Sequence, residues 1–197
     1  MNFFVRKILG RHFSPAEWAN FLVKETAESA GKVFNDKLFQ KQVRMQELEE
    51  EEQNRIFNEV QATGITFVIL LVENRVRYVA DGREAHWREV IEKIPEIFCQ
   101  WLEEIGIPRE FVLTWGKLID LRLDEYRQGI FETADAFERQ NGERGDDARM
   151  AYLRLETVAA LSMMHITRGK ARPGDPLQRH LMTWLGVLES NIVKNIE

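Results

Sequence analysis

Three short stretches of this chain share one pattern that starts a helix. They are Ser14-Pro15-Ala16-Glu17, Asp81-Gly82-Arg83-Glu84 and Asp175-Pro176-Leu177-Gln178. Each begins with a side chain that can accept hydrogen bonds from the free N–H groups of a first helical turn, and each carries Glu or Gln three residues later. In two of them Pro occupies the first helical position, where its missing N–H costs nothing. The pattern therefore predicts helices that begin just after residues 14, 81 and 175.

Apolar residues between these starts recur at the spacing of a helix. This periodicity predicts an all-α protein, a globular multi-helix bundle of about six to eight helices in one domain over residues 1–197. With 44% hydrophobic residues the chain can bury a full core, and only 12 Gly and 5 Pro disfavour a turn-rich β fold. Pro95 lies inside the apolar stripe from Trp87 to Ile105, which predicts a kink there.

Residues 65–72 are apolar on every side and predict the central, buried helix of the bundle. The alternative is a β-hairpin over residues 65–79, because Val, Ile, Phe and Tyr favour strands. Its turn would be Glu73-Asn74, which lacks the Gly that a tight hairpin usually has after Asn. The helix is therefore the favoured interpretation.

Two segments differ from the rest of the bundle. Residues 1–13 form a short N-terminal amphipathic segment, which docks onto the bundle or meets a membrane surface or a partner through its cations and Phe side chains. Residues 37–52 hold few apolar residues and predict a polar helix that can protrude from the body or mediate pairing. The acidic run 47–52 at its end is expected to be a solvated face, because neighbouring carboxylates on a helix do not converge on one ion.

Net charge and cysteine content limit which partners and which cellular compartment the protein is expected to have. A net charge of −5 argues against broad nucleic-acid binding, which depends on Lys and Arg. The single cysteine, Cys99, excludes an intramolecular disulfide and lies in an apolar helical context, which predicts a buried or half-buried thiol. The apolar run 65–72 is shorter than the roughly 20 residues that cross a bilayer. We therefore expect a cytoplasmic protein with no membrane span and no nucleic-acid partner.

Motifs of catalysis are absent from the sequence. It holds no Gly-rich nucleotide loop, no His-Glu-x-x-His motif and no Glu-x-x-His pair, and its four histidines occur singly. No catalytic residue, metal ligand or cofactor is therefore predicted, and the sequence leans away from an enzyme.

Four residues are weak candidates for contact with a ligand. Glu156 and His165 lie in the otherwise apolar segment 148–167, where a polar side chain needs a partner. Tyr126 and Trp115 lie on the inner face of the helix expected over 108–140, where aromatic side chains can line a pocket. The competing interpretation is structural: all four belong to the core, and Glu156 bonds to Arg149 and Tyr152 along one face.

Two charged groups could meet a ligand or an ion. The basic loop with Arg168, Lys170 and Arg172 suits a phosphate or an acidic partner, and Arg179 and His180 of the next helix could join it. The alternative is an exposed loop between two helices. Asp120, Asp124 and Asp135 of the helix over 108–140 suit Mg²⁺ only if a second helix brings further carboxylates to them.

Three interpretations of function follow. The favoured one is a helical interaction or regulatory protein of unknown partner, self-association included, which would leave an exposed apolar patch on the packed bundle. The alternative is a small-molecule-binding helical bundle, which would form a cavity between aromatic side chains with His165 or Glu156 among its polar groups. A divalent-cation-dependent hydrolase ranks last.

Overall fold

The computed structural model describes residues 13–76, 82–172 and 174–196, and within these ranges every regular element is helical. The elements are α2 (Pro15–Phe34), α3 (Lys37–Gln42), the 3-10 turn η1 (Met45–Glu47), α4 (Glu50–Val76), α5 (Glu84–Glu104), α6 (Arg109–Asn141), α7 (Asp147–Thr167) and α8 (Pro176–Ile196). The predicted all-α multi-helix bundle is confirmed.

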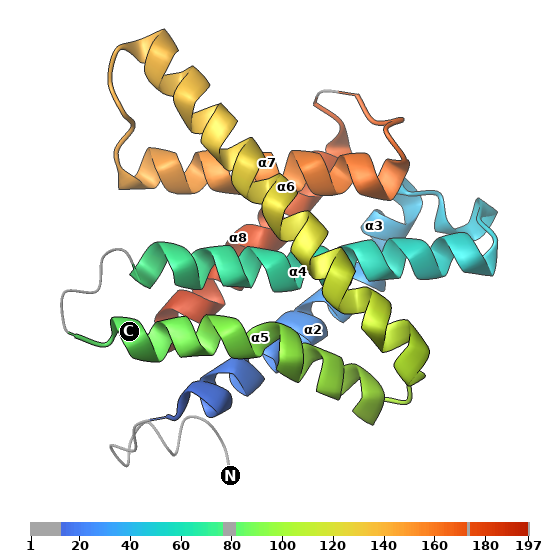
Figure 1. Cartoon of the computed structure of the whole chain (residues 1–197). Coiled ribbons are helices and arrows are strands. Elements are labelled where there is room, and N and C mark those ends of the chain that lie inside the picture. Colours follow the sequence, from blue (N-terminus) through green and yellow to red (C-terminus); the bar gives the residue numbers. More distant parts are fainter. Residues whose placement is uncertain (1–12, 77–81, 173, 197) are drawn as a thin grey trace.

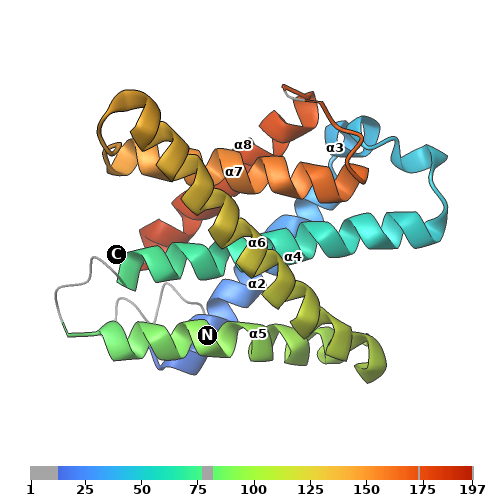
Figure 2. The same ribbon diagram turned by 45° about the horizontal axis from the view of Figure 1, so that its top comes forward.

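Helix α4 occupies the centre of the bundle. It lies between α5 and α7 and runs antiparallel to both, while α6 crosses one face of this layer and α2 and α8 cross the other (Figures 1 and 2). Every residue from Glu59 to Val72 is buried, because neighbouring helices cover α4 on all sides. The helical interpretation of residues 65–76 is confirmed and the hairpin is wrong, with residues 77–79 outside the described part.

The same helix is long and apolar enough to cross a membrane. In the described ranges α4 alone meets that criterion, and 83% of its apolar window is buried inside the bundle. The core helix of a soluble protein has the same length and composition. Burial against the other helices therefore accounts for its apolar sequence.

Two of the three expected helix starts are correct. The Ser14 hydroxyl accepts from the Glu17 N–H at 3.3 Å, and the Glu17 carboxylate accepts from the Ser14 N–H at 3.0 Å. Asp175 Oδ1 accepts from the Leu177 N–H at 2.9 Å at the start of α8. The third start is wrong. Gly82 has a φ of +74°, outside the helical range, and α5 begins two residues later, at Glu84. Asp81 itself lies outside the described residues.

The single polar helix expected over residues 37–52 is also wrong. The Asp36 carboxylate accepts from the N–H groups of Leu38 and Phe39, both at 2.9 Å, and so starts the short helix α3. Arg44 then takes a left-handed conformation with a φ of +54°, which interrupts the helix before η1 and α4. The buried side chain of Phe39 holds this segment against the body of the bundle.

Helix α5 continues through Pro95 from Glu84 to Glu104. The kink expected there stays a prediction. Of the amphipathic segment at the N-terminus, residues 1–12 lie outside the described part of the chain.

Candidate functional site

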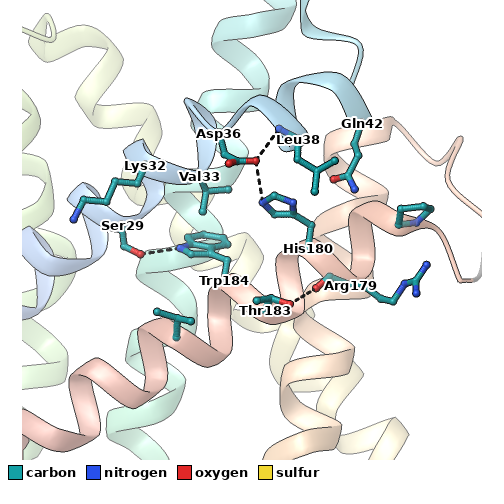
Figure 3. Close-up of a pocket in the computed structure, with 12 residues that line it drawn as sticks. Ser29, Lys32, Val33, Asp36, Leu38, Gln42, Arg179, His180, Thr183 and Trp184 are labelled. Carbon is teal, nitrogen blue, oxygen red and sulfur yellow. Dashed lines mark hydrogen bonds and ion pairs between the residues drawn. The ribbon is translucent and has the colours of Figure 1, made fainter.

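A groove of about 700 Å³ lies at the corner where α2 ends and α3 begins, facing the first half of α8 (Figure 3). The corner exists because the chain leaves α2 at Asn35 and starts α3 at the Asp36 cap, which turns the backbone sharply. Helix α8 packs against both α2 and α3, and so forms the opposite wall of the groove.

The floor and rim of the groove are largely apolar. Trp184 of α8 is buried there, and its indole N–H donates to the Ser29 hydroxyl at 2.9 Å, which fixes the plane of the ring (Figure 3). Val33 lies beside it on α2. At the rim, Leu38 and Val187 are each more than half exposed. Together these side chains present an apolar surface that is open to solvent.

The charged side chains around the groove differ in whether they already have partners. Asp36 is already engaged: its backbone hydrogen bonds to Phe39 and Leu38 and the nearby His180 hold the pKa of its carboxyl below its usual value, against the opposing effect of desolvation. His180 Nε2 lies 3.7 Å from Asp36 Oδ1. Lys32 and Arg179 also line the groove, and neither forms an ion pair with any residue that the structure describes. The groove therefore offers two available cations beside an apolar floor.

Tyr126, one of the four ligand candidates, is fully buried between α4, α6 and α7 instead. Its hydroxyl lies 3.0 Å from Thr63 Oγ1, which lies 2.8 Å from Ser162 Oγ. Burial raises the pKa of Tyr126 above its ordinary value, so its hydroxyl remains a hydrogen-bond donor even in alkaline solution. These three hydroxyls satisfy one another inside the core.

His165, a second candidate, belongs to a neighbouring chain of charged groups. His165 Nε2 lies 2.7 Å from Glu125 Oε2, and Glu125 also meets Arg122 at 3.3 Å. Arg122 forms two hydrogen bonds with Glu59, at 2.9 and 2.7 Å, and both of these side chains are buried. The structure therefore brings Tyr126 and His165 into one polar region, where both find partners within the protein.

The other two ligand candidates lie elsewhere. Trp115 is buried against Phe98, edge to face, with 5.3 Å between ring centroids. Glu156 is half-buried on α7. The expected bond from Arg149 to Glu156 does not form, because the Arg149 guanidinium lies over the Tyr152 ring, 5.2 Å from its centroid. The four candidates therefore do not make one site.

The basic loop and the acidic run meet each other. Arg168 donates to Glu52 at 2.5 Å, and Glu52 also accepts from Arg55 at 2.7 and 2.9 Å. Arg55 donates in turn to the backbone carbonyls of His165 and Ile166, at 2.9 and 2.7 Å, at the C-terminal end of α7. Half-buried Glu52 is thus an exception to the solvated face expected for the acidic run.

Most of the remaining candidates are exposed. Lys170 and Arg172 are exposed, as are Asp120 and Asp124 on α6, whereas Asp135 is half-buried and forms an ion pair with Arg139. In the described ranges no three His, Cys, Asp or Glu side chains come together where they could hold a metal ion. Cys99 is half-buried as expected, and burial raises the pKa of its thiol.

Helix α6 carries a second apolar surface. Four large apolar side chains along it are each more than half exposed: Phe111, Leu113, Leu121 and Phe131. The helix packs against α4, α5 and α7 on its inner side, and Figure 1 shows no other described helix over its outer side.

Sequence reasoning did not identify the groove. Arg179 and His180, which the sequence offered as possible additions to the basic loop, line the groove with Trp184. Trp184 lies on the apolar stripe of its helix, and that signal is compatible with a place in the core or beside a pocket. Comparison of the chain with known protein families, with curated proteins and with solved structures finds no match.

Proposed function

We propose that the protein is an interaction protein that binds an acidic, amphipathic segment of a partner protein in the groove between α2, α3 and α8. The observation that carries the proposal is an apolar groove, open to solvent, with the available cations Lys32 and Arg179 beside it. Exposed apolar surface of this kind is typical of interaction sites. The two cations favour a bound segment that carries carboxylates.

The dimensions of the groove suit a short segment. Its wall on α8 runs from Pro176 to Val187, roughly 16 Å at 1.5 Å per residue. About three turns of an amphipathic helix cover that length, with apolar side chains facing the groove. Trp184 supplies the kind of large, fixed aromatic side chain that often dominates the binding energy of an interface.

The overall charge of the chain makes this surface selective. With a net charge of −5 the protein repels acidic partners in general, so an acidic segment is attracted only where cations are concentrated. Lys32 and Arg179 therefore orient the segment, and its association rate should fall as salt is raised.

Site-specific photo-crosslinking tests this proposal in the cells from which the protein comes. The crosslinking amino acid p-benzoylphenylalanine replaces Val187 at the rim of the groove, or Glu89, an exposed residue of α5, as the control. We expect one discrete adduct from position 187, mapped by mass spectrometry to an apolar segment rich in Asp and Glu, and none from position 89.

Charge reversal identifies the contact. The double change Lys32→Glu/Arg179→Glu should remove the adduct, whereas Lys170→Glu/Arg172→Glu, the same change in charge on the exposed loop, should leave it. An adduct that survives the groove variant, maps to a basic segment or to a small molecule, or never forms would refute the proposal.

Self-association is a second candidate, favoured by the exposed apolar side chains of α6. Lys117 lies four residues before Leu121 and Asp124 three residues after it. In an antiparallel pair of α6 helices that meet at Leu121, each Lys117 therefore lies beside Asp124 of the second copy. This charge complementarity makes a second copy the proposed occupant of this face.

Light scattering coupled to size-exclusion chromatography tests that candidate. We expect a dimer mass at high protein concentration, and we expect Leu121→Glu to return the protein to monomer. Val187→Glu, an equal change in the groove, should leave the dimer intact. A monomer at every concentration would exclude pairing through α6.

A further inference from the structure

Two cavities open side by side near the C-terminal end of α4. One of about 330 Å³ lies between α4, α6 and α7, and one of about 180 Å³ lies between α4, α7 and α8. Asn74 and Arg154 line both, so they form a common wall. The α2–α3–α8 groove shares none of these lining residues.

Arg154 is an unusual side chain for the inside of a bundle. It is only 9% exposed, and one nitrogen, Nη2, donates to Glu189 at 2.6 Å. Its Nε has no hydrogen-bond partner among the residues that the structure describes. A guanidinium has five N–H donors, and a buried one without matching acceptors destabilises the fold. A bound anion would supply the acceptors that the protein itself does not.

The charges along the two cavities are predominantly positive. Four arginines line them against two glutamates: Arg75, Arg127, Arg144 and Arg154 against Glu73 and Glu189. Glu73 is already held by Arg127, and Glu189 by Arg154. Arg144, in the loop after α6, forms no ion pair with any described residue. The excess of cations stands out in a chain whose net charge is −5.

The larger cavity also has an apolar wall. Leu70, Ile130 and Met150 line it from α4, α6 and α7. A volume of about 330 Å³ lies at the small end of ligand pockets, which run from roughly 300 to 1,000 Å³. The space therefore suits a small molecule with a short apolar body and an anionic head.

From this arrangement we propose that the arginine-lined cavities form a binding site for a small organic anion. Its carboxylate or phosphate meets Arg154 and Arg144, and its apolar body lies against Leu70, Ile130 and Met150. Guanidinium groups suit both heads, because their paired N–H donors match two oxygens of either one. This site is independent of the groove and of its proposed partner.

Isothermal titration calorimetry of the full chain at low ionic strength tests the site with three probes. Octanoate and octyl phosphate carry the apolar body with the two heads, and inorganic phosphate carries a head alone. We expect at least one octyl probe to bind with a dissociation constant below 1 mM, and inorganic phosphate to bind at least tenfold more weakly. The preferred octyl probe identifies the head.

Three charge reversals locate the binding. Arg144→Glu should weaken binding of the preferred octyl probe at least tenfold. Since Arg144 is exposed and forms no ion pair with a described residue, the variant should fold. Arg172→Glu on the basic loop and Arg179→Glu in the groove make the same change in net charge and should alter the affinity less than twofold. Arg154→Met should abolish binding, with circular dichroism as the check that the variant is folded.

Several results would overturn the proposal. They are no heat from either octyl probe at 1 mM, equal losses in Arg144→Glu and Arg172→Glu, and a loss confined to Arg179→Glu, which would place the anion in the groove. If inorganic phosphate binds as tightly as the octyl probes, the apolar wall does not contribute to binding and the proposed ligand class is wrong. If Arg154→Met fails to fold, Arg144→Glu and its two controls decide the outcome.

Discussion

Individual residues decide stability most clearly in the polar region between α4 and α6. Glu59 and Arg122 are 63 positions apart in sequence, yet they form a buried pair with two hydrogen bonds. A buried pair of this kind contributes little against an apolar pair of the same size, but removal of one partner leaves a buried, uncompensated charge. The cost of a substitution here therefore depends on what remains behind.

Arg122→Met should lower the free energy of unfolding by about 3–5 kcal/mol, because the Glu59 carboxylate is then buried without its partner. The double variant Arg122→Met/Glu59→Met should be more stable than the single variant. Urea titration at pH 7 measures these two variants together with the single variant Glu59→Met. If the double variant loses as much as the sum of the two single changes, the two side chains are not coupled.

Glu52 should make the stability of the fold depend on pH in the acidic range. The hydrogen bond from Arg55 lowers the pKa of its carboxyl below the usual 4.5, against the opposing effect of desolvation, and Arg168 adds to the lowering. A carboxyl with a lowered pKa in the folded state stabilises the protein above its ordinary pKa. That contribution is lost as the pH falls through the lower, folded value.

Glu52→Gln should therefore be less stable than the natural chain at pH 7, and the difference should shrink as the pH falls from about 5 towards 3. Urea titrations across this range give the comparison. Glu51→Gln, the exposed neighbour, serves as the control and should follow the pH profile of the natural chain. A constant difference between Glu52→Gln and the natural chain would contradict the role given to its charge.

The sequence predicted which residues are buried better than it predicted their partners. The stripe of its helix placed Tyr126 in the core, and burial of a polar group implied a partner for His165. It could not show that Thr63 or Glu125 is that partner, because helical periodicity gives the face of a helix but not the helix opposite. The pairs form only when α4, α6 and α7 pack together.

Among the helices, local chemistry determined where sequence reasoning succeeded. Ser14 and Asp175 begin helices because their caps act within one turn, which a sequence displays in full. The start after Asp81 failed because Gly82 takes a positive φ before the helix begins. The break at Arg44 failed because a left-handed conformation at a non-glycine residue has no strong sequence signal.

Two glycines inside helices should respond to alanine in opposite directions. A Cβ at Gly64 of α4 would lie 2.8 Å from Thr26 Cγ2, and Thr26 is buried with its hydroxyl bonded to the Leu22 carbonyl at 2.6 Å. Since a buried, hydrogen-bonded Thr26 or the backbone of α4 must shift to make room, Gly64→Ala should destabilise the protein by about 1–3 kcal/mol.

Gly116 of α6 is the matched control, since a Cβ there would meet no atom within 4 Å. Gly116→Ala should stabilise the protein by up to about 1 kcal/mol through helix propensity alone. Thermal unfolding followed by circular dichroism measures both variants. Equal shifts in the same direction would show that α4 does not approach α2 as closely as the structure indicates.

At the scale of the whole molecule, α8 links the two proposed sites. It lines the groove through Trp184 and Val187, and nearer its C-terminal end it lines an arginine cavity through Glu189 and Ile192. Neither site follows from the sequence. A groove or cavity is the space that remains between packed helices, and its shape depends on crossing positions that periodicity does not contain.

The position of α4 predicts that the whole chain unfolds as one unit. This helix packs against α2, α5, α6, α7 and α8, so each of the other long helices loses part of its core contacts once α4 is lost. The tryptophans report on four of these neighbours: Trp18, Trp87, Trp101, Trp115 and Trp184. Urea curves from tryptophan fluorescence and from circular dichroism should therefore coincide in a single transition.

Phe67→Ala tests the same point from the centre, because Phe67 of α4 is fully buried. We expect a loss of about 3–5 kcal/mol in the free energy of unfolding, the range for a large side chain removed from a core. Both probes should shift together to the same lower midpoint. Two separate transitions, or a shift in one probe alone, would mean that the helices around α4 form more than one cooperative unit, and the single helical domain would have to be divided.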